Sequence, residues 1–303
     1  MGKPDGGGVD GLVVVDKPPG CTSHDVVSRL RKAYGTRKVG HAGTLDPDAT
    51  GVLLVGVGRV TRLLRFLTEA GKTYRGEIAF GAATDTLDAG GAVVARRSMP
   101  DLTESALRGV LGRFVGEVSQ TPPMVSALKV GGKRLHELAR QGEAVERAPR
   151  LVRIDEITLE AFSGGDEPRA TVVVACGSGV YIRSLAADIG SALGGLAHLG
   201  WLRRLAVGPF SLADAHPLAD IEADPSSALL PPAGALPHLP RTQVDTRTAE
   251  GVSHGVVFPA TLLGAAADHG VIAVVGPDER LLAVYDRGRT AARPLVVLGP
   301  GPS

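Results

Sequence analysis

Aromatic residues and cysteines are scarce in this chain, which limits the residues that can fill the core and the number of possible disulfides. Phe, Trp and Tyr make up 4% of the residues, so Val, Leu and Ala must fill most of the core. Apolar residues account for 44%, which is too much for a disordered chain and enough for a sizeable core. The two cysteines, Cys21 and Cys176, could form one disulfide. Their wide separation and the lack of CxxC spacing favour a reducing cytosol instead.

The sequence also lacks targeting and membrane-spanning signals. The opening MGKPDGGGVDG has no apolar segment of the kind that a secretory signal needs. No run of ~18 apolar residues is available for a membrane span. We therefore expect a cytoplasmic protein that makes no membrane contact.

Motifs for cofactors and metals are missing as well. No GxxxxGK(S/T) phosphate-binding loop occurs, and GVGRVT lacks the third glycine of a dinucleotide fingerprint. Neither HExxH nor a Cys/His metal spacing is present, and the eight histidines are scattered. We expect neither a cofactor nor a metal ion.

Length and composition predict two domains. A chain of 303 residues suggests two on a prior of about 150 residues each. Residues 1–10 have the composition of a flexible Gly-rich tail, and residues 11–222 form the predicted main domain. Residues 223–241, ADPSSALLPPAGALPHLPR, are typical of a linker. Residues 242–303 hold short strands separated by turn signals and predict a small β-domain.

Positive charge is concentrated in the first quarter of the chain. The segment from Lys17 to Arg75 carries 11 Lys and Arg against 4 Asp and Glu, although the whole chain has a net charge of +1. Residues 120–150 are also rich in Lys, Arg, Pro and Gly, and we interpret them as a projecting insertion. This distribution indicates a polyanionic partner, with ordinary solvated charge as an equally weighted alternative.

One polar stretch, GHAGTLDPDATG, stands between a basic helix and an apolar strand. Asp46 precedes Pro47, whose ring biases the Asp46 backbone to an extended form and stiffens the turn. Gly40 and Gly43 allow a sharp bend or a close approach to a ligand. The stretch is either an Asx-type turn or a loop that holds the Asp46 carboxylate in a fixed pose.

These residues resemble the catalytic motif of the TruB family of tRNA pseudouridine synthases. The resemblance extends over residues 11–210 through LVVVDKPPGCTSHDVV, KTYRGEIAFGAATDTLDAGG, TPPMVSALKVGGKRLHELARQG, GVYIRSLAADIGSALG and LRRLAVGPF. It implies a mixed α/β (α+β) catalytic domain around a central, mostly antiparallel sheet, followed by a PUA-like β-domain. It also implies isomerisation of uridine 55 in the T-loop of tRNA, by cleavage of the glycosidic bond, rotation of the base and rejoining through C5.

The resemblance assigns roles to six positions. Asp46 matches the essential aspartate, Arg183 matches the arginine that pairs with it, and Tyr74 matches the tyrosine that stacks on the target base and accepts its C5 proton. Tyr181 and Leu202 match residues against the flipped base, and His41 matches the histidine that fills the vacated space. Taken alone, Tyr74 and Leu202 would be core residues, His41 a solvated loop residue and Arg183 a surface arginine.

Basic residues supply the expected RNA contacts, which are Lys17, Arg62, Lys129, Lys133 and Arg134. The DKP turn that contains Lys17 favours a structural role for this residue, with phosphate contact as the lesser option. The expected partner is the T-stem-loop of tRNA, and no obligatory protein partner is expected. Two alternatives remain open: a guide-dependent rRNA pseudouridine synthase, and an RNA-binding or RNA-folding module without catalysis.

Overall fold

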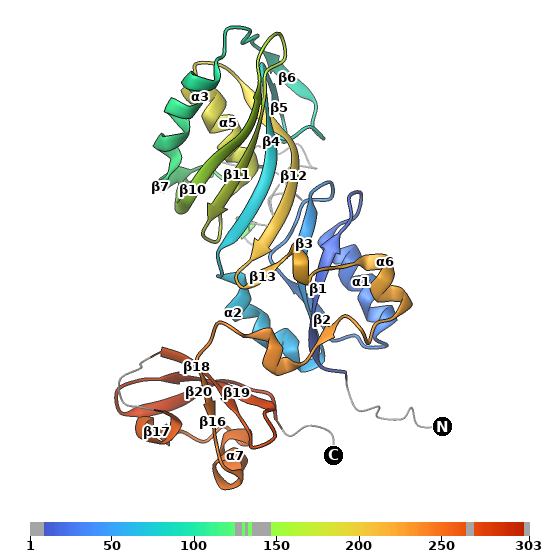
Figure 1. Ribbon diagram of the computed structural model, residues 1–303, viewed down its shortest axis with the longest axis vertical. Coiled ribbons are helices and arrows are strands. Elements are labelled where there is room, and N and C mark those ends of the chain that lie inside the picture. Colours follow the sequence, from blue (N-terminus) through green and yellow to red (C-terminus); the bar gives the residue numbers. More distant parts are fainter. Residues whose placement is uncertain (1–8, 125–128, 131–132, 135–146, 265–269, 300–303) are drawn as a thin grey trace.

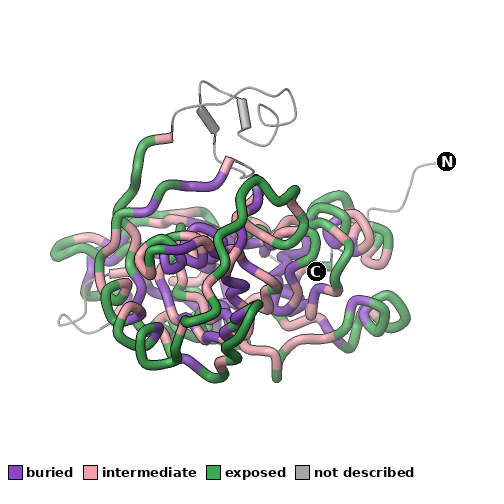
Figure 2. Tube along the Cα trace, turned by 90° about the horizontal axis from the view of Figure 1, so that it is seen from above, coloured by how far each residue is buried: buried purple, intermediate pink, exposed green. Residues whose placement is uncertain are grey.

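The computed structural model describes residues 9–124, 147–264 and 270–299, together with the backbone of residues 129–130 and 133–134. The chain has a mixed α/β fold, as predicted, with one large sheet and a smaller C-terminal sheet (Figure 1). In a view along the long axis, buried residues lie toward the middle and exposed residues lie mostly on the outside (Figure 2).

An 11-stranded sheet forms the body of the main domain. The pairs β1–β14 and β3–β12 are parallel and the other pairs described are antiparallel, which confirms the predicted sheet type. In spatial order the strands are β14 (His216–Pro217), β1 (Gly11–Lys17), β3 (Thr50–Val57), β12 (Ala197–Val207), β4 (Lys72–Phe80), β11 (Arg169–Cys176), β10 (Arg150–Ser163) and β7 (Gly116–Gln120). Strands β2 (Val39–Ala42), β13 (Phe210–Ser211) and β15 (Leu229–Leu230) pair with β3, β12 and β1.

Helix α1 (Ser23–Ala33) covers one face of strands β1 and β3. It begins at a capping box, in which the Thr22 side chain accepts from the Asp25 amide and the Asp25 carboxylate accepts from the Thr22 amide. Its buried residues Val26, Val27 and Leu30 pack into one cluster with alternate residues of both strands. Helix α6 (Leu218–Ala223) adds to the same face.

The helical segment after β3 is divided into two pieces. It begins as a 3-10 helix, η1 (Gly58–Leu63), and continues as α2 (Leu64–Thr68). Most of its apolar residues are buried, because they pack together on the face of β1 and β3 opposite α1. These residues are Val60, Leu63, Leu64 and Leu67.

Helix α5 (Ile182–Ala192) and helix α3 (Glu104–Leu111) cover the other half of the sheet. Tyr74, Ile78 and Phe80 of β4 lie in the cluster beneath them and form the apolar face of that strand. The short hairpin β5 (Ala82–Thr84) and β6 (Val93–Arg96) leaves the end of β4, and its turn returns to β12 through a bridge between Asp88 and Leu199.

The C-terminal domain is a five-stranded sheet that shares a core with the main domain. Its order is β16 (Arg241–Gln243), β18 (Gly270–Val275), β19 (Leu281–Arg287), β20 (Ala291–Val297) and β17 (Phe258–Pro259). Helix α7 (Thr246–Ser253) and η5 (Ala260–Leu263) complete it. Val275, Val284 and Leu298 of this domain belong to the same buried cluster as Leu63 and Leu67.

The predicted linker, 223–241, packs against the main domain. Its strand β15 pairs with β1, and Ala235 and Leu236 near η4 (Pro232–Ala235) are buried in the shared cluster. The predicted tail is described only from Val9 onward. Of the predicted insertion, Lys129, Lys133 and Arg134 lie on the backbone strands β8 (Lys129–Val130) and β9 (Lys133–Arg134), and their side chains lie outside the described residues.

Both cysteines are free thiols in the described part of the chain. None of the helices described there is both long enough and apolar enough to cross a bilayer. The same residues contain no cluster of His, Cys, Asp and Glu side chains suited to holding a metal ion.

Candidate active site

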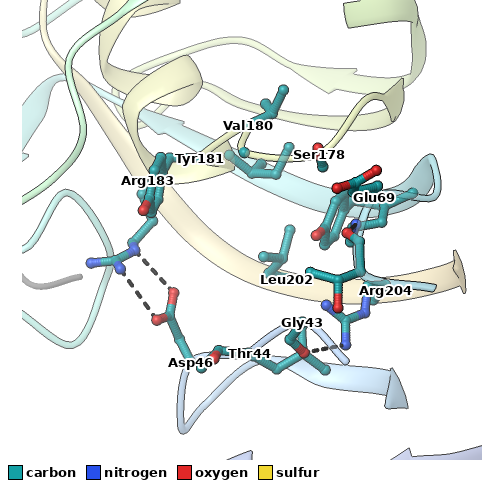
Figure 3. Close-up of a pocket in the computed structure, with 16 residues that line it drawn as sticks. Gly43, Thr44, Asp46, Glu69, Ser178, Val180, Tyr181, Arg183, Leu202 and Arg204 are labelled. Carbon is teal, nitrogen blue, oxygen red and sulfur yellow. Dashed lines mark hydrogen bonds and ion pairs between the residues drawn. The ribbon is translucent and has the colours of Figure 1, made fainter. Parts of the chain in front are cut away.

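A cavity of about 430 Å³ opens at the centre of the main sheet. Its volume lies in the range of roughly 300–1,000 Å³ that is typical of small-molecule sites. The loop after β2, the start of β4, the loop before α5 and the middle of β12 supply its walls (Figure 3). These segments bring together Asp46, Tyr74, Tyr181, Arg183, Leu202 and Arg204.

The loop that carries Asp46 is held on both sides of this residue. Ser23, in the first turn of α1, accepts a hydrogen bond from the Leu45 amide at 2.9 Å and donates to the Leu45 carbonyl at 3.1 Å. On the other side, the Pro47 carbonyl accepts from the Gly20 amide and from Lys17 Nζ. The predicted stiffness of the turn therefore has tertiary as well as local causes.

The contacts of Lys17 favour the structural one of its two predicted roles. Its side chain is fully buried, and its Nζ donates to the carbonyls of Pro18, Cys21 and Pro47 at 2.7–2.9 Å. All three ammonium donors are thus used inside the protein, which leaves none for a phosphate.

The Asp46 side chain reaches across the cavity to Arg183 instead of closing an Asx turn. Arg183 Nε lies 3.0 Å from one carboxylate oxygen and Nη2 lies 3.2 Å from the other, a bidentate pair (Figure 3). Arg183 Nη1 donates to the Thr86 carbonyl at 3.0 Å and lies 3.5 Å from Asp88. Arg183 is only 4% exposed, so it is not the surface arginine that the bare sequence suggested.

The net effect on Asp46 differs from the effect expected for a simple ion pair. Burial raises the pKa of the Asp46 carboxyl, Arg183 opposes this rise, and the nearby Asp88 carboxylate adds to it. The resulting pKa is above the ordinary value, because desolvation and the second carboxylate outweigh the guanidinium. Arg183 therefore limits a rise in the pKa of Asp46, whereas a pairing arginine alone would be expected to lower it.

Tyr74 and Leu202 come from neighbouring strands and form the floor of the cavity. Leu202 faces Gly76 across the β12–β4 pair, two residues along β4 from Tyr74. The Tyr74 ring is buried, with 8% exposure, and burial raises the pKa of its phenol. A flat ring and a branched apolar side chain in one cavity suit a planar ligand.

Tyr181 is positioned by a side chain that the sequence motifs did not single out. Gln120, at the end of β7, donates to the Tyr181 carbonyl at 3.0 Å and accepts from the Tyr181 amide at 2.8 Å. These two hydrogen bonds attach the loop before α5 to the end of β7. Nothing in the sequence around Gln120 signals this pairing, because the two positions are 61 residues apart.

His41 lies on β2, beside the cavity and outside its lining. Its Nδ1 is buried and has no hydrogen-bond partner within the described part of the chain. Burial lowers the pKa of His41, and the positive charge of Arg204 lowers it further. Both effects favour the uncharged form of the imidazole.

Several arginines in the basic first quarter of the chain serve the fold. Arg62 donates to the Val297 carbonyl of the C-terminal domain. Arg59 pairs with Asp10 and donates to the Leu298 carbonyl, while Arg29 pairs with Glu222. Much of the Arg62 side chain still faces solvent, so its RNA contact stays a prediction.

Asp88 is another functional candidate, and the sequence motifs did not single it out either. It follows β5 in the turn TDTLDAGG, where Thr86 Oγ1 and the Gly90 amide donate to its carboxylate. The two acidic residues of this short turn, Asp85 and Asp88, are the sequence feature that could have indicated a functional role. The proximity of Asp88 to Asp46 depends on the β5–β6 hairpin, which no local pattern predicts.

The fold and the cavity define a class: a mixed α/β enzyme whose site pairs a carboxylate with a buried guanidinium. Comparison with known proteins identifies the family. Residues 31–182 match the model described as TruB family pseudouridylate synthase (N terminal domain). Residues 183–230 match the tRNA pseudouridylate synthase B C-terminal domain, and residues 239–299 match tRNA Pseudouridine synthase II, C terminal. The chain belongs to the TruB family of pseudouridylate synthases, which are isomerases.

Similar proteins support this assignment over nearly the whole chain. A tRNA pseudouridine synthase B from Mycobacterium sp. (strain KMS) is 44% identical over 97% of this chain and 98% of its own length. One from Symbiobacterium thermophilum is 51% identical over 82% of this chain and 83% of its own. A chain in the crystal structure of a Cbf5-Nop10-Gar1 complex has a TM-score of 0.74 at 28% identity, covering 96% of this chain and 85% of that one.

Proposed function

We propose that this protein converts uridine 55 in the T-loop of tRNA to pseudouridine, with Asp46 as the essential group. The observation that carries the proposal is the bidentate Asp46–Arg183 pair at the wall of a nucleotide-sized cavity. The names of the similar proteins supply the substrate class, since both relatives described above are called tRNA pseudouridine synthase B.

The reaction is an isomerisation, and its atoms balance without a co-reactant. The C1′–N1 bond breaks, the base turns, and a C1′–C5 bond forms. C5 loses its proton and N1 gains one, so nothing is oxidised or hydrolysed. The Asp46 carboxylate either attacks the sugar or removes a ribose proton, and both routes require the ionised form.

The cavity accommodates the target only after the nucleotide has left its stack. Flipping a base costs a few kcal/mol, which protein contacts must offset. Tyr74, Tyr181 and Leu202 would hold the extruded base between an aromatic ring and apolar surface. An uncharged His41 ring would stack in the vacated space, and stacking of this kind contributes ~1–3 kcal/mol per base.

The RNA backbone would be held by basic residues outside the cavity. Lys129, Lys133 and Arg134 of the insertion and the solvent-facing Arg62 are the proposed contacts. Neutralising about six phosphates would make affinity fall steeply with salt. No obligatory protein partner is proposed for this activity.

Asp46→Asn tests the proposal. The matched control is Asp48→Asn, because Asp48 lies two residues further along the same loop, is exposed and is not part of the cavity lining. Each pure protein is incubated with an unmodified tRNA transcript, and mass spectrometry of nuclease fragments locates pseudouridine. We expect product at the T-loop from the wild type and the control, and none from Asp46→Asn, with all three binding tRNA.

Other outcomes distinguish the alternatives. If wild type binds tRNA but forms no pseudouridine with or without a guide RNA and partner proteins, the non-catalytic RNA-binding function is correct. If it acts only when a guide RNA and partner proteins are supplied, it is a guide-dependent enzyme; the similarity to a chain in the Cbf5-Nop10-Gar1 complex is the observation in favour of that alternative.

A second variant tests the role of Tyr74. Tyr74→Phe removes the hydroxyl and keeps the ring, so we expect turnover to be lost or greatly slowed. The affinity for tRNA should stay within about threefold, or ~0.65 kcal/mol. Unchanged turnover would reduce Tyr74 to a packing residue.

A further inference from the structure

Arg204 is a fully buried cation that links the Asp46 loop to the strand pair β12–β4. It lies on β12 directly opposite Tyr74 of β4 in the strand register, and both residues line the cavity. Its Nε donates to the Val52 carbonyl of β3 at 2.7 Å. Its Nη2 donates at 3.1 Å to the carbonyl of Gly43, at the start of the Asp46 loop (Figure 3).

The close packing around Arg204 leaves this arrangement little freedom. Gly51 of β3 has a φ of +100°, and a Cβ there would come within 2.1 Å of the Arg204 carbonyl oxygen. The backbone of β12 is therefore pressed against β3 where the Arg204 side chain begins. The guanidinium crosses from this point to Gly43, so it connects three elements of the site by direct contacts.

The charge of Arg204 has no counter-ion within the described residues. It forms no ion pair there, and its Nη1 is buried and makes no hydrogen bond of ordinary geometry. Two nearby groups are basic: Lys72 lines the same cavity, and His41 lies beside it. A buried charge without a partner is costly, so such a residue is expected only where its charge acts on something else.

The direction in which Arg204 moves the pKa of each neighbouring group indicates what its charge acts on. Burial lowers the pKa of Lys72, and Arg204 lowers it further. For Tyr74, burial raises the pKa of the phenol and Arg204 opposes the rise. The guanidinium thus disfavours further positive charge and favours a negative oxygen at Tyr74.

We propose that Arg204 is a positioning residue that fixes the Asp46 loop through Gly43 and holds a positive charge beside the Tyr74 hydroxyl. This inference rests on the proposed role of Tyr74 as acceptor of the C5 proton. The Tyr74 oxygen gives its own proton to water and then takes the proton from C5. N1 takes a proton from water, so the overall proton count is unchanged.

Arg204→Gln and Arg204→Lys test the inference, with Arg203→Gln as the matched control. Arg203 is the preceding residue on the same strand, pairs with Asp16 at 2.7 Å and lies outside the cavity lining. Single-turnover rates are measured from about pH 6 to about pH 9 on the RNA that wild type modifies, a range that spans the usual working region of acid–base groups. RNA affinity and thermal unfolding are measured alongside.

We expect Arg204→Gln to lower the rate by about tenfold or more, which is less than the roughly 10²–10⁴-fold that complete loss of acid–base catalysis costs. The rate should rise with pH as the Tyr74 phenol loses its proton. In Arg204→Gln this rise should occur at higher pH than in wild type, while RNA affinity stays within about threefold. Arg204→Lys keeps the charge and should retain a pH profile close to that of wild type, even if its rate falls through loss of the guanidinium hydrogen bonds. Arg203→Gln should leave both rate and profile unchanged.

An unaltered pH profile in Arg204→Gln would overturn the inference and leave Arg204 as a scaffold residue. If that variant does not fold, wild type containing 3-fluorotyrosine, a more acidic phenol, provides the same readout. Its rate should begin to rise at lower pH, and an unchanged profile would again refute the role. Wild type that is inactive on tRNA but active on another RNA contradicts only the proposed substrate, so the two failures are distinguishable.

Discussion

Replacing Arg183 by Met should destabilise the protein in a strongly pH-dependent way. The guanidinium is 4% exposed and contacts two carboxylates, Asp46 and Asp88, and the Thr86 carbonyl. Methionine preserves the apolar part of the side chain but leaves both carboxylates without the cation between them. The stabilisation that the substitution removes is therefore electrostatic, and it involves two acidic groups at once.

The magnitude follows from how far the two carboxylates are buried. Removing one partner of a fully buried ion pair costs about 3–5 kcal/mol. The Asp46 and Asp88 side chains are 42% and 28% exposed, so solvent recovers part of this and the expected cost near pH 8 is about 2 kcal/mol. Arg203→Met is the control: its ion pair with Asp16 joins side chains that are 36% and 29% exposed, and such pairs contribute roughly 0–1 kcal/mol.

The sign of the pH dependence is fixed by the direction in which the Asp46 pKa moves. The folded-state pKa of Asp46 is already raised, and removal of Arg183 takes away the group that opposed the rise. A carboxyl with a raised folded pKa favours folding below its unfolded pKa and loses that contribution as pH rises through the folded pKa. The cost of Arg183→Met should thus be smaller near pH 5 than near pH 8. The cost at pH 8 should exceed the cost at pH 5 by up to ~1.4 kcal/mol for each tenfold fall that the substitution causes in the acid dissociation constant of Asp46.

Urea unfolding of wild type, Arg183→Met and Arg203→Met at both pH values measures this difference. Turnover by Arg183→Met should be lost, while tRNA affinity changes little, because the guanidinium is buried and pairs inside the protein. A destabilisation of equal size at the two pH values would refute the electrostatic argument and make Arg183 a packing residue.

Three further substitutions test how the site is built. Gln120→Ala removes both hydrogen bonds to the Tyr181 backbone; urea unfolding should show a loss of about 1–3 kcal/mol, and turnover should fall more than tRNA binding. Lys17→Met leaves the Pro47 carbonyl and two others without their buried donor. We expect the free energy of unfolding to fall by about 2–4 kcal/mol, and the slope of tRNA affinity against salt to stay unchanged. A shallower slope would indicate that Lys17 contacts a phosphate. Gly51→Ala forces a Cβ into the β12 backbone at a positive φ; a melting temperature equal to that of wild type would contradict the close approach described for these strands.

The sequence by itself determined the local structure of this protein. The Thr22–Asp25 capping box is readable because both partners of the cap lie within one turn of chain. The apolar face of β4 is readable because strand side chains alternate with a period of two. Family motifs singled out Asp46, Tyr74 and Arg183, and the structure brings all three to one cavity.

Only the tertiary structure decided how these residues act together. The raised pKa of Asp46 depends on burial and on Asp88, which joins the site through a hairpin far along the chain. Arg59 and Gln120 were indistinguishable in sequence from surface residues, yet each makes its decisive contacts with a distant segment, and Lys17 also binds a carbonyl of a distant loop. Hydrogen bonds and desolvation depend on distances between such segments, and these distances are set by strand order and packing rather than by any local pattern.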